Sequence, residues 1–307
     1  MEIEEDIALA PLTTMKVGGT ARFFCACASE EEIGEALEWA GGRGVRVHVL
    51  GGGSNTIFAD AGFDGLVLKV GIGGVERQQM GEENLVTAGA GEDWDALVLS
   101  CIESDLSGIE CLSGIPGSVG ASPIQNVGAY GQEVRQTVAL VRAFDRRTLL
   151  QVEFTREECD FAYRQSRFKG RDRDHFIITQ VQFRLPRQVI PELRYAELQR
   201  NLDEAGVNLN RLEPGRPASS AIRELVLGLR RRKSMVLDPT DPNSRSVGSF
   251  FLNPVLSPAE VEQLRDRWRQ AGGEGEVPSY PERDRARVPA AWLVERAGFH
   301  KGFRRGG

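Results

Sequence analysis

The chain lacks several features that large classes of protein require. Its 307 residues include only three histidines, and none of its five cysteines belongs to a CxxC pair, so a metal centre is poorly supplied. No apolar run approaches the roughly 20 residues of a membrane helix. The N-terminal segment MEIEEDIALAPL is acidic and lacks the apolar stretch of an export signal. We therefore expect a cytoplasmic protein with free thiols, no metal and no membrane insertion.

A basic excess is also missing, because the formal net charge is -6. This charge argues against a general binder of nucleic acid or of membrane surfaces. The composition, 41% hydrophobic and 27% charged, is that of an ordinary globular protein. The length suggests about two domains.

The first 70 residues have the pattern of an α/β unit. Residues 22–28 read as a strand, and Ser29 with Glu32 forms a capping box that predicts the start of a helix. Residues 45–50 and 66–70 read as two further strands. The second of the three strands runs directly into a glycine-rich turn.

That turn has residues suited to binding a pyrophosphate. Glycines let backbone amides approach phosphate oxygens closely, and serine and asparagine side chains add hydrogen bonds. The spacing is not GxGxxG, because Thr56 stands where the third glycine should be. A plain strand-to-loop turn therefore explains the pattern as well. The residues of the turn are Gly51, Gly52, Gly53, Ser54 and Asn55.

A second candidate segment follows a strand at 84–90 and an amphipathic helix that begins near Trp94. Residues 109–131 are rich in glycine and too irregular for helix or strand, yet too apolar for a disordered linker. Such a loop can clamp a planar ligand or can be a structural Ω-loop, and the residues alone leave both open. Its small-residue part comprises Ile115, Pro116, Gly117, Ser118, Gly120, Ala121 and Ser122.

Strand-like segments return at 137–145, 149–154 and 176–185, and a stretch rich in proline and polar residues follows. We place a domain boundary there, which gives residues 1–187 as one domain and 188–307 as another. The first would have subdomains of about 1–70 and 71–187. The second opens with a helix that ends in the basic run RRRK at 230–233.

Four blocks in this order carry a family resemblance. They are LGGGSN at 50–55, IPGSVGASPIQNVGAYG at 115–131, FAYRQSRFK at 161–169 and GSFFLNP at 248–254. Together they resemble the UDP-N-acetylenolpyruvoylglucosamine reductase family, also called UDP-N-acetylmuramate dehydrogenases. The similarity runs from about Pro11 to the final residues.

The resemblance implies an α+β protein with an FAD-binding fold of the vanillyl-alcohol-oxidase type. Two α/β subdomains would hold FAD non-covalently, and residues 188–307 would form an α+β substrate domain. The glycine turn and the small-residue loop would wrap FAD, with Gly128 near the isoalloxazine ring. None of His48, His175 and His300 falls in a loop where a flavin-linking histidine would be expected. NADPH would be the hydride donor and a UDP-sugar the substrate.

The family's reaction reduces UDP-N-acetylglucosamine enolpyruvate to UDP-N-acetylmuramate for peptidoglycan precursor synthesis. Hydride addition to the terminal alkene carbon pushes charge toward the carboxylate, so the site needs a cation and an acid. Arg164 matches the family's stabilising arginine, and Ser249 matches its proton-donating serine. Taken alone, both residues would be read as surface or turn residues.

Four further residues match positions that contact ligands in the family. Tyr163 would pack on flavin or substrate. Tyr195, Lys233 and Asn253 would grip the diphosphate or sugar, although Lys233 also suits a plain helix end.

Two departures from the family pattern affect the prediction. Leu252 stands where family members can carry a lysine. The family also supplies a catalytic glutamate from a segment beyond the point where this chain stops, so we expect an incomplete C-terminal domain. We also expect FAD to be retained better than substrate is turned over. Two other functions remain open, a flavin oxidase of the same superfamily and a non-catalytic UDP-sugar or nucleotide-binding remnant.

Overall fold

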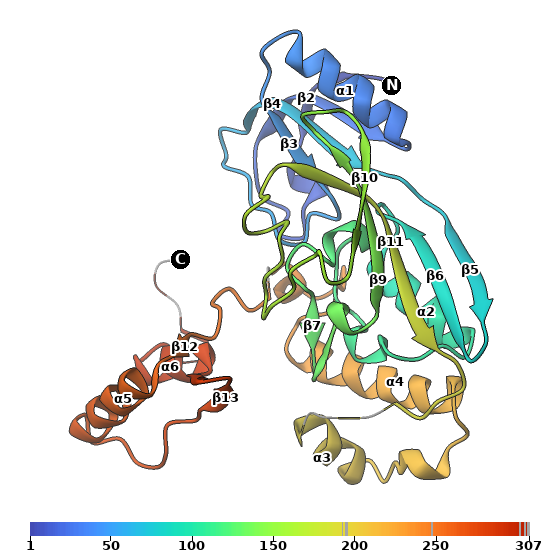
Figure 1. Cartoon of the computed structure of the whole chain (residues 1–307). Helices are drawn as coiled ribbons and strands as arrows, with labels where there is room; N and C mark the ends of the chain where they lie inside the picture. Colours follow the sequence, from blue (N-terminus) through green and yellow to red (C-terminus); the bar gives the residue numbers. More distant parts are fainter. Residues whose placement is uncertain (192, 194–195, 247, 301, 304, 306–307) are drawn as a thin grey trace. The chain divides into compact units, whose positions relative to one another are not determined.

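The computed structural model describes residues 1–191, 193, 196–246, 248–300, 302–303 and 305. The chain divides into two compact units, 1–247 and 248–307, which are described separately below (Figure 1).

The first unit begins with a four-stranded sheet in the order β1-β2-β4-β3. Its parallel strands are β2 (Thr20–Cys27), β4 (Phe63–Val70) and β3 (Val47–Leu50), and β1 (Glu4–Ala8) pairs antiparallel with β2. Helix α1 (Glu30–Gly41) packs on β2 and β4 (Figure 1). It begins where Ser29 accepts a hydrogen bond from the Glu32 amide, as the capping motif predicts.

An antiparallel sheet of five strands follows in the order β10-β9-β11-β6-β5. The strands are β5 (Val75–Met80), β6 (Glu83–Gly89), β9 (Val138–Asp145), β10 (Gln151–Thr155) and β11 (Phe176–Pro186). Helix α2 (Trp94–Glu103) buries the apolar stripe predicted from the sequence, which comprises Trp94, Leu97, Val98, Cys101 and Ile102. These side chains join those of both sheets in one continuous core.

The irregular segment 109–136 lies between α2 and β9. It contains the short 3₁₀ helices η2 (Glu110–Leu112), η3 (Val119–Ala121) and η4 (Val134–Gln136), and a small hairpin of β7 (Gly128–Ala129) and β8 (Gln132–Glu133). Three further 3₁₀ helices are η1 (Ala10–Leu12), η5 (Leu209–Arg211) and η6 (Pro242–Ser244).

Helices α3 (Ala196–Glu204) and α4 (Arg216–Arg232) complete the first unit. Helix α4 crosses one end of the five-stranded sheet (Figure 1) and contacts α2 and η2. Its apolar face forms a separate cluster with Cys111 and Leu198. A buried hydrogen bond of 2.9 Å between the Ser107 and Ser219 hydroxyls also ties α4 to the segment that follows α2. These contacts explain why residues 188–247 belong to the first compact unit.

The second unit contains a three-stranded sheet of β12 (Val255–Leu256), β14 (Arg285–Arg287) and β13 (Tyr280–Glu282). Helices α5 (Pro258–Gln270) and α6 (Ala290–Arg296) accompany it. The rings of Trp268 and Trp292, one from each helix, meet edge to face with centroids 5.2 Å apart. A capping box of Ser257 and Glu260 is complete at the start of α5.

No helix in the described ranges is long and apolar enough to cross a bilayer. All five cysteines are free and buried. The division at residue 187 into cofactor and substrate domains is a functional one and stays a prediction.

Candidate cofactor and substrate site

The structure brings the glycine turn after β3 against the small-residue loop before η3. A Cβ built on Gly52 would lie 2.6 Å from the Gly117 Cα, and one on Gly51 would lie 2.7 Å from the Ser118 hydroxyl. Such distances are far below an ordinary contact, so the two backbones approach as closely as they do only because glycine stands there. Two segments about 65 residues apart in sequence therefore form one cradle.

Backbone hydrogen bonds from other segments anchor both loops. The Gly53 carbonyl accepts from the Thr14 amide at 3.1 Å, and the Gly117 carbonyl accepts from the Trp94 amide at 3.0 Å. Gly53 and Gly117 have φ angles of 66° and 128°, which glycine adopts without strain. The cradle is thus held by the segment after η1 and by the first residue of α2.

A buried hydroxyl in this cradle lacks a hydrogen-bond partner. Ser122 is 2% exposed, and its Oγ is one of two buried side-chain polar atoms without a partner in the part of the chain that the structure describes. A buried, unpaired hydroxyl is costly unless a ligand or water completes it. This hydroxyl fits a cofactor with hydrogen-bonding groups.

Arg164 is presented by a tight turn next to the same loop. The turn is closed by reciprocal backbone hydrogen bonds between Ala162 and Gln165, of 3.0 and 3.2 Å. Arg164 has a φ angle of 54°, which is unusual for a residue with a side chain. Its guanidinium donates to the Gly128 carbonyl at 2.5 Å. The predicted catalytic arginine and the predicted isoalloxazine-side glycine are therefore in direct contact.

Two further cations lie close to Arg164. Lys169 donates to the Arg164 carbonyl at 3.0 Å, and burial together with the charge of Arg164 lowers the pKa of Lys169. Arg230, at the end of α4, is only 9% exposed and donates to the Gly114 carbonyl at 3.3 Å. Burial lowers the pKa of Arg230, and the charge of Arg164 adds to this effect. The result is a positive region that suits an anionic ligand.

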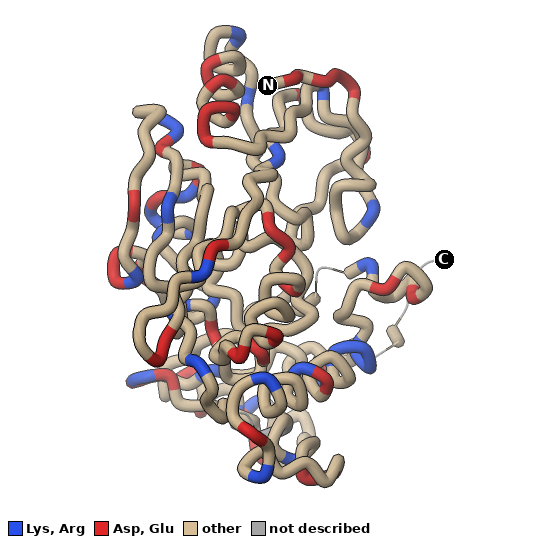
Figure 2. Tube along the Cα trace, turned by 90° about the vertical axis from the view of Figure 1, so that its right-hand side faces the viewer, with Lys and Arg blue, Asp and Glu red and all other residues tan. Residues whose placement is uncertain are grey.

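Gly114, which precedes the cofactor loop, is held from both sides. Its amide donates to Asp95 at 2.6 Å, and its carbonyl accepts from Arg230. Asp95 also forms a two-pronged pair with Arg223 of α4, at 2.5 and 2.8 Å. Helix α4 is therefore linked to the start of the loop by two arginines (basic residues are blue in Figure 2).

The remaining predicted ligand residues are placed as follows. Tyr163 shares the turn with Arg164, whose guanidinium carbon lies 6.0 Å from the tyrosine ring centroid. Lys233 is the exposed C-terminal cap of α4. Tyr195 lies outside the described residues. Ser249 and Asn253 belong to the second unit, where Ser249 is exposed and Asn253 accepts from the Ala290 amide at 2.9 Å, at the start of α6.

Comparison with known proteins identifies the family. The UDP-N-acetylenolpyruvoylglucosamine reductase of Thermobifida fusca (strain YX) is 44% identical over 302 residues, which cover 97% of this chain and 82% of the relative. The reductase of the same name from Cutibacterium acnes is 43% identical, with coverage of 98% and 75%. The chain belongs to the UDP-N-acetylenolpyruvoylglucosamine reductase family.

The cofactor domain and the fold have independent matches. Residues 21–147 match the family model described as FAD binding domain. The crystal structure of UDP-N-acetylenolpyruvylglucosamine reductase from Thermus caldophilus aligns with a TM-score of 0.56 at 22% identity, over 96% of this chain and 94% of that one. The α+β fold with an FAD-binding domain is confirmed, and so is the family resemblance. The protein is an oxidoreductase that uses FAD.

Several residues that build the site have no role in the sequence motifs as we interpreted them. They are Asp95, Asn126, Ser166, Lys169 and Arg230, all of which hold the loops or the turn through hydrogen bonds. The second and third signature blocks contain Asn126, Ser166 and Lys169, so the motifs themselves could have indicated that these residues belong to the site. Asp95 lies outside the blocks, and Arg230 read as an ordinary helix-end residue.

Proposed function

We propose that this protein reduces UDP-N-acetylglucosamine enolpyruvate to UDP-N-acetylmuramate with NADPH, as a cytoplasmic step in the synthesis of peptidoglycan precursors. The observation that most supports the proposal is the contact of Arg164 with Gly128 beside the glycine cradle. The contact supports the proposal because the chemistry needs a fixed cation, and Arg164 lies against the segment that follows the loop expected to bind the cofactor.

The cradle residues would hold FAD non-covalently. Gly51, Gly52 and Gly53 let the turn pack tightly against neighbouring backbone, and its amides would donate to the pyrophosphate. The Ser122 hydroxyl, which is unpaired, would supply a further hydrogen bond to the cofactor. Ser54, Asn55, Ile115, Pro116, Ser118, Gly120 and Ala121 would complete the contact surface. When bound, FAD supplies hydride chemistry between NADPH and the substrate alkene.

Arg164 would stabilise the charge that develops on the substrate. Hydride addition to the terminal alkene carbon places negative charge on the carbon that bears the carboxylate, and on the carboxylate itself. A guanidinium is planar and always charged, so it can bind the carboxylate through two hydrogen bonds. Lys169 and Arg230 would strengthen the same positive field.

Ser249 would complete the reaction as the acid. Its hydroxyl would give a proton to the carbon that bears the carboxylate, and solvent would return a proton to the serine oxygen. The carbanionic carbon is a strong base, so an unperturbed hydroxyl is acidic enough if it is well positioned. Tyr163, Tyr195, Lys233 and Asn253 would hold the UDP-sugar.

The experiment follows NADPH oxidation with the UDP-sugar enolpyruvate as acceptor, and weighs the product by mass spectrometry. We expect oxidation that depends on the acceptor, and a product heavier than the substrate by two hydrogens. Arg164→Met should lower kcat by about 100- to 1000-fold, the usual cost of removing a group that stabilises a developing charge. Arg173→Met is the control, because the Arg173 side chain is 77% exposed.

Three results would contradict the proposal. Activity in Arg164→Met equal to that of Arg173→Met would remove Arg164 from the mechanism. Consumption of oxygen with an alcohol substrate, without need for NADPH, would indicate an oxidase. Binding of the UDP-sugar without any product would indicate a non-catalytic module.

A further inference from the structure

The turn that carries Arg164 is held by contacts from outside it as well as by its own backbone hydrogen bonds. Arg164 occupies the left-handed region with a φ angle of 54°, where side chains are disfavoured. Such a conformation persists when surrounding contacts fix it. The structure shows what those contacts are.

Three hydrogen bonds dock the turn onto the segment 124–128 that follows the cofactor loop. Asn126 Nδ2 donates to the Ala162 carbonyl at 2.9 Å, Ser166 Oγ donates to the Ile124 carbonyl at 2.5 Å, and Arg164 donates to the Gly128 carbonyl at 2.5 Å. On the turn, the three bonds involve Ala162 at its start, Arg164 in its centre and Ser166 just after its end. Together they leave the turn little freedom to move relative to that segment.

Asn126 joins three segments at once. Besides the bond to Ala162, its Nδ2 donates to Glu133 at 3.0 Å, and its Oδ1 accepts from the Arg135 amide at 3.0 Å. The side chain is 1% exposed, and its φ angle of 45° is one that asparagine tolerates well. Any other side chain would lose these hydrogen bonds, and most would also disfavour the left-handed backbone conformation.

Ser166 is equally enclosed. It is 1% exposed, and its hydroxyl reaches a carbonyl 42 residues away in sequence. Neither Asn126 nor Ser166 is needed to close the turn, which its own backbone bonds already do. Their hydrogen bonds hold the turn against the segment 124–128.

We propose that Asn126 and Ser166 are positioning residues, which set the Arg164 guanidinium relative to the bound flavin and substrate. This inference rests on the proposed role of Arg164. Since the cofactor cradle is anchored separately by Trp94 and Thr14, loss of the docking bonds should leave FAD binding intact. It should slow the step in which the substrate is reduced.

The test uses the full chain with Ser166→Ala, and with Asn126→Gly as a second variant that tolerates the φ angle of 45° and loses the three side-chain hydrogen bonds without adding a charge. Ser107→Ala is the matched control, because Ser107 is also 1% exposed and loses a buried hydroxyl bond, to Ser219. We expect FAD content and the rate of flavin reduction by NADPH within twofold of the unaltered enzyme. Reoxidation by the UDP-sugar and kcat should fall at least tenfold in both variants and stay unchanged in the control.

A double-mutant comparison separates positioning from general damage. If Ser166 acts through Arg164, then adding Ser166→Ala to Arg164→Met should lower kcat no further than twofold. An equal loss in the presence and absence of Arg164 would overturn the inference. So would a Ser166→Ala enzyme as fast as the Ser107→Ala control.

Hydrogen exchange provides a second measurement, which needs neither the cofactor nor enzyme activity. Hydrogen exchange of the peptide 160–168 in the protein without FAD should be faster in Ser166→Ala and unchanged in Ser107→Ala. If the unaltered enzyme failed to turn over the UDP-sugar, the proposed function would be wrong, and this exchange would still decide whether the docking bonds hold the turn. Unchanged exchange in Ser166→Ala would overturn the docking itself.

Discussion

Gly52 lies against Gly117 in the cradle, and the Gly52 position has no room for a side chain. A Cβ on Gly52 would meet three backbone atoms of Gly117 and Ser118 at 2.6 to 2.8 Å. Backbone atoms cannot rotate away as a flexible side chain can. The loops would have to separate, and the surface that holds the cofactor would change shape.

We therefore predict that Gly52→Ala weakens FAD binding. Overpacking of this kind typically costs about 1–3 kcal/mol, which corresponds to a loss of affinity of roughly 5- to 150-fold. Titration of the protein with FAD, followed by flavin fluorescence, measures it. Gly41→Ala is the control, because a Cβ on Gly41 at the end of α1 meets nothing within 4 Å. Equal FAD affinities for the two variants would contradict the prediction.

The residues of the signature blocks could be predicted from the sequence, but their partners could not. Nothing in the pattern of FAYRQSRFK indicates that Ser166 bonds to Ile124, or that Asn126 bonds to Ala162. These contacts join segments about 40 residues apart, and side-chain hydrogen bonds at that range depend on the packed fold. A motif therefore identifies the functional residue more readily than it identifies what holds that residue in place.

At the scale of secondary-structure elements, the pair of Asp95 and Arg223 joins α2 to α4. Burial alone would raise the pKa of Asp95. The hydrogen bonds from Arg223 and from the Gly114 amide, with the charges of Arg223 and Arg230, outweigh it and lower that pKa. The ion pair is only partly enclosed, with the side chains of Asp95 and Arg223 32% and 12% exposed.

We predict that Asp95→Asn lowers the free energy of unfolding by about 2 kcal/mol, because it leaves a mostly buried guanidinium without its anion. The loss should depend on pH. A carboxyl with a lowered folded pKa stabilises the fold above its unfolded value of about 3.9, and this contribution disappears as the pH falls through the folded pKa. The difference between the two proteins should thus be constant near neutral pH and shrink below about pH 4.

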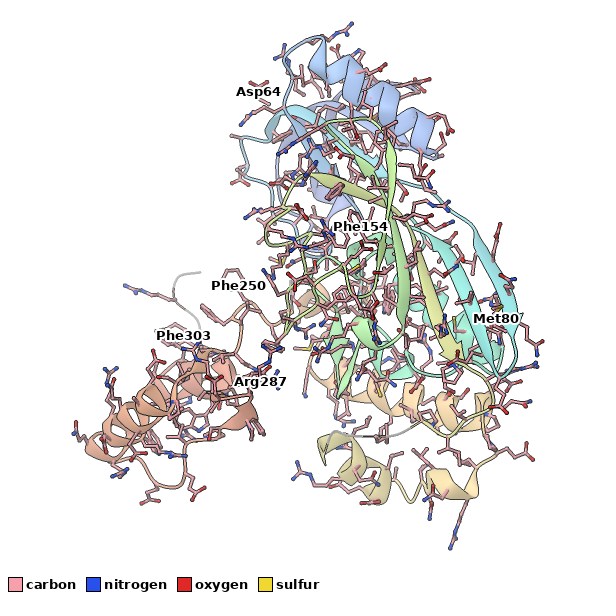
Figure 3. The ribbon with its side chains drawn as sticks, in the orientation of Figure 1. Asp64, Met80, Phe154, Phe250, Arg287 and Phe303 are labelled. Atoms are coloured by element: carbon pink, nitrogen blue, oxygen red, sulfur yellow. The ribbon has the colours of Figure 1, made fainter. Side chains whose placement is uncertain are left out.

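Urea unfolding at several pH values measures this effect. Asp64→Asn is the matched control, since Asp64 pairs with Arg22 at the surface and both side chains are more than half exposed (Figure 3). That substitution should cost no more than about 1 kcal/mol. A difference for Asp95→Asn that stays constant into strong acid would contradict the assigned ion pair.

The elements with a clear apolar period could be predicted from the sequence, whereas polar edge strands could not. Strand β5 has the sequence VERQQM and is almost wholly exposed, with Met80 53% exposed at its end (Figure 3). Strand β1, EEDIA, is similarly exposed. Charged residues on an edge strand prevent it from pairing with the strands of other molecules. The same residues interrupt the alternation of apolar and polar side chains from which a strand is predicted.

For the whole molecule, residues 188–247 belong to the same compact unit as the residues before them, and the division at residue 187 into cofactor and substrate domains stays a prediction. The proline-rich, polar stretch after β11 reads as a linker, yet α4 beyond it packs on η2 and α2 through apolar contacts and two arginines. Composition indicates where a chain is irregular. It does not indicate with which compact unit the next helix packs.

We conclude that the chain is an FAD-dependent reductase of an enolpyruvyl UDP-sugar. An anaerobic titration tests it most directly, with the visible absorption of the purified protein recorded at each step. We predict a yellow protein that bleaches when NADPH is added and regains its colour when UDP-N-acetylglucosamine enolpyruvate follows. A folded protein that is colourless and binds no added FAD, or one whose bleached flavin keeps its reduced spectrum after the UDP-sugar is added, would contradict the claim.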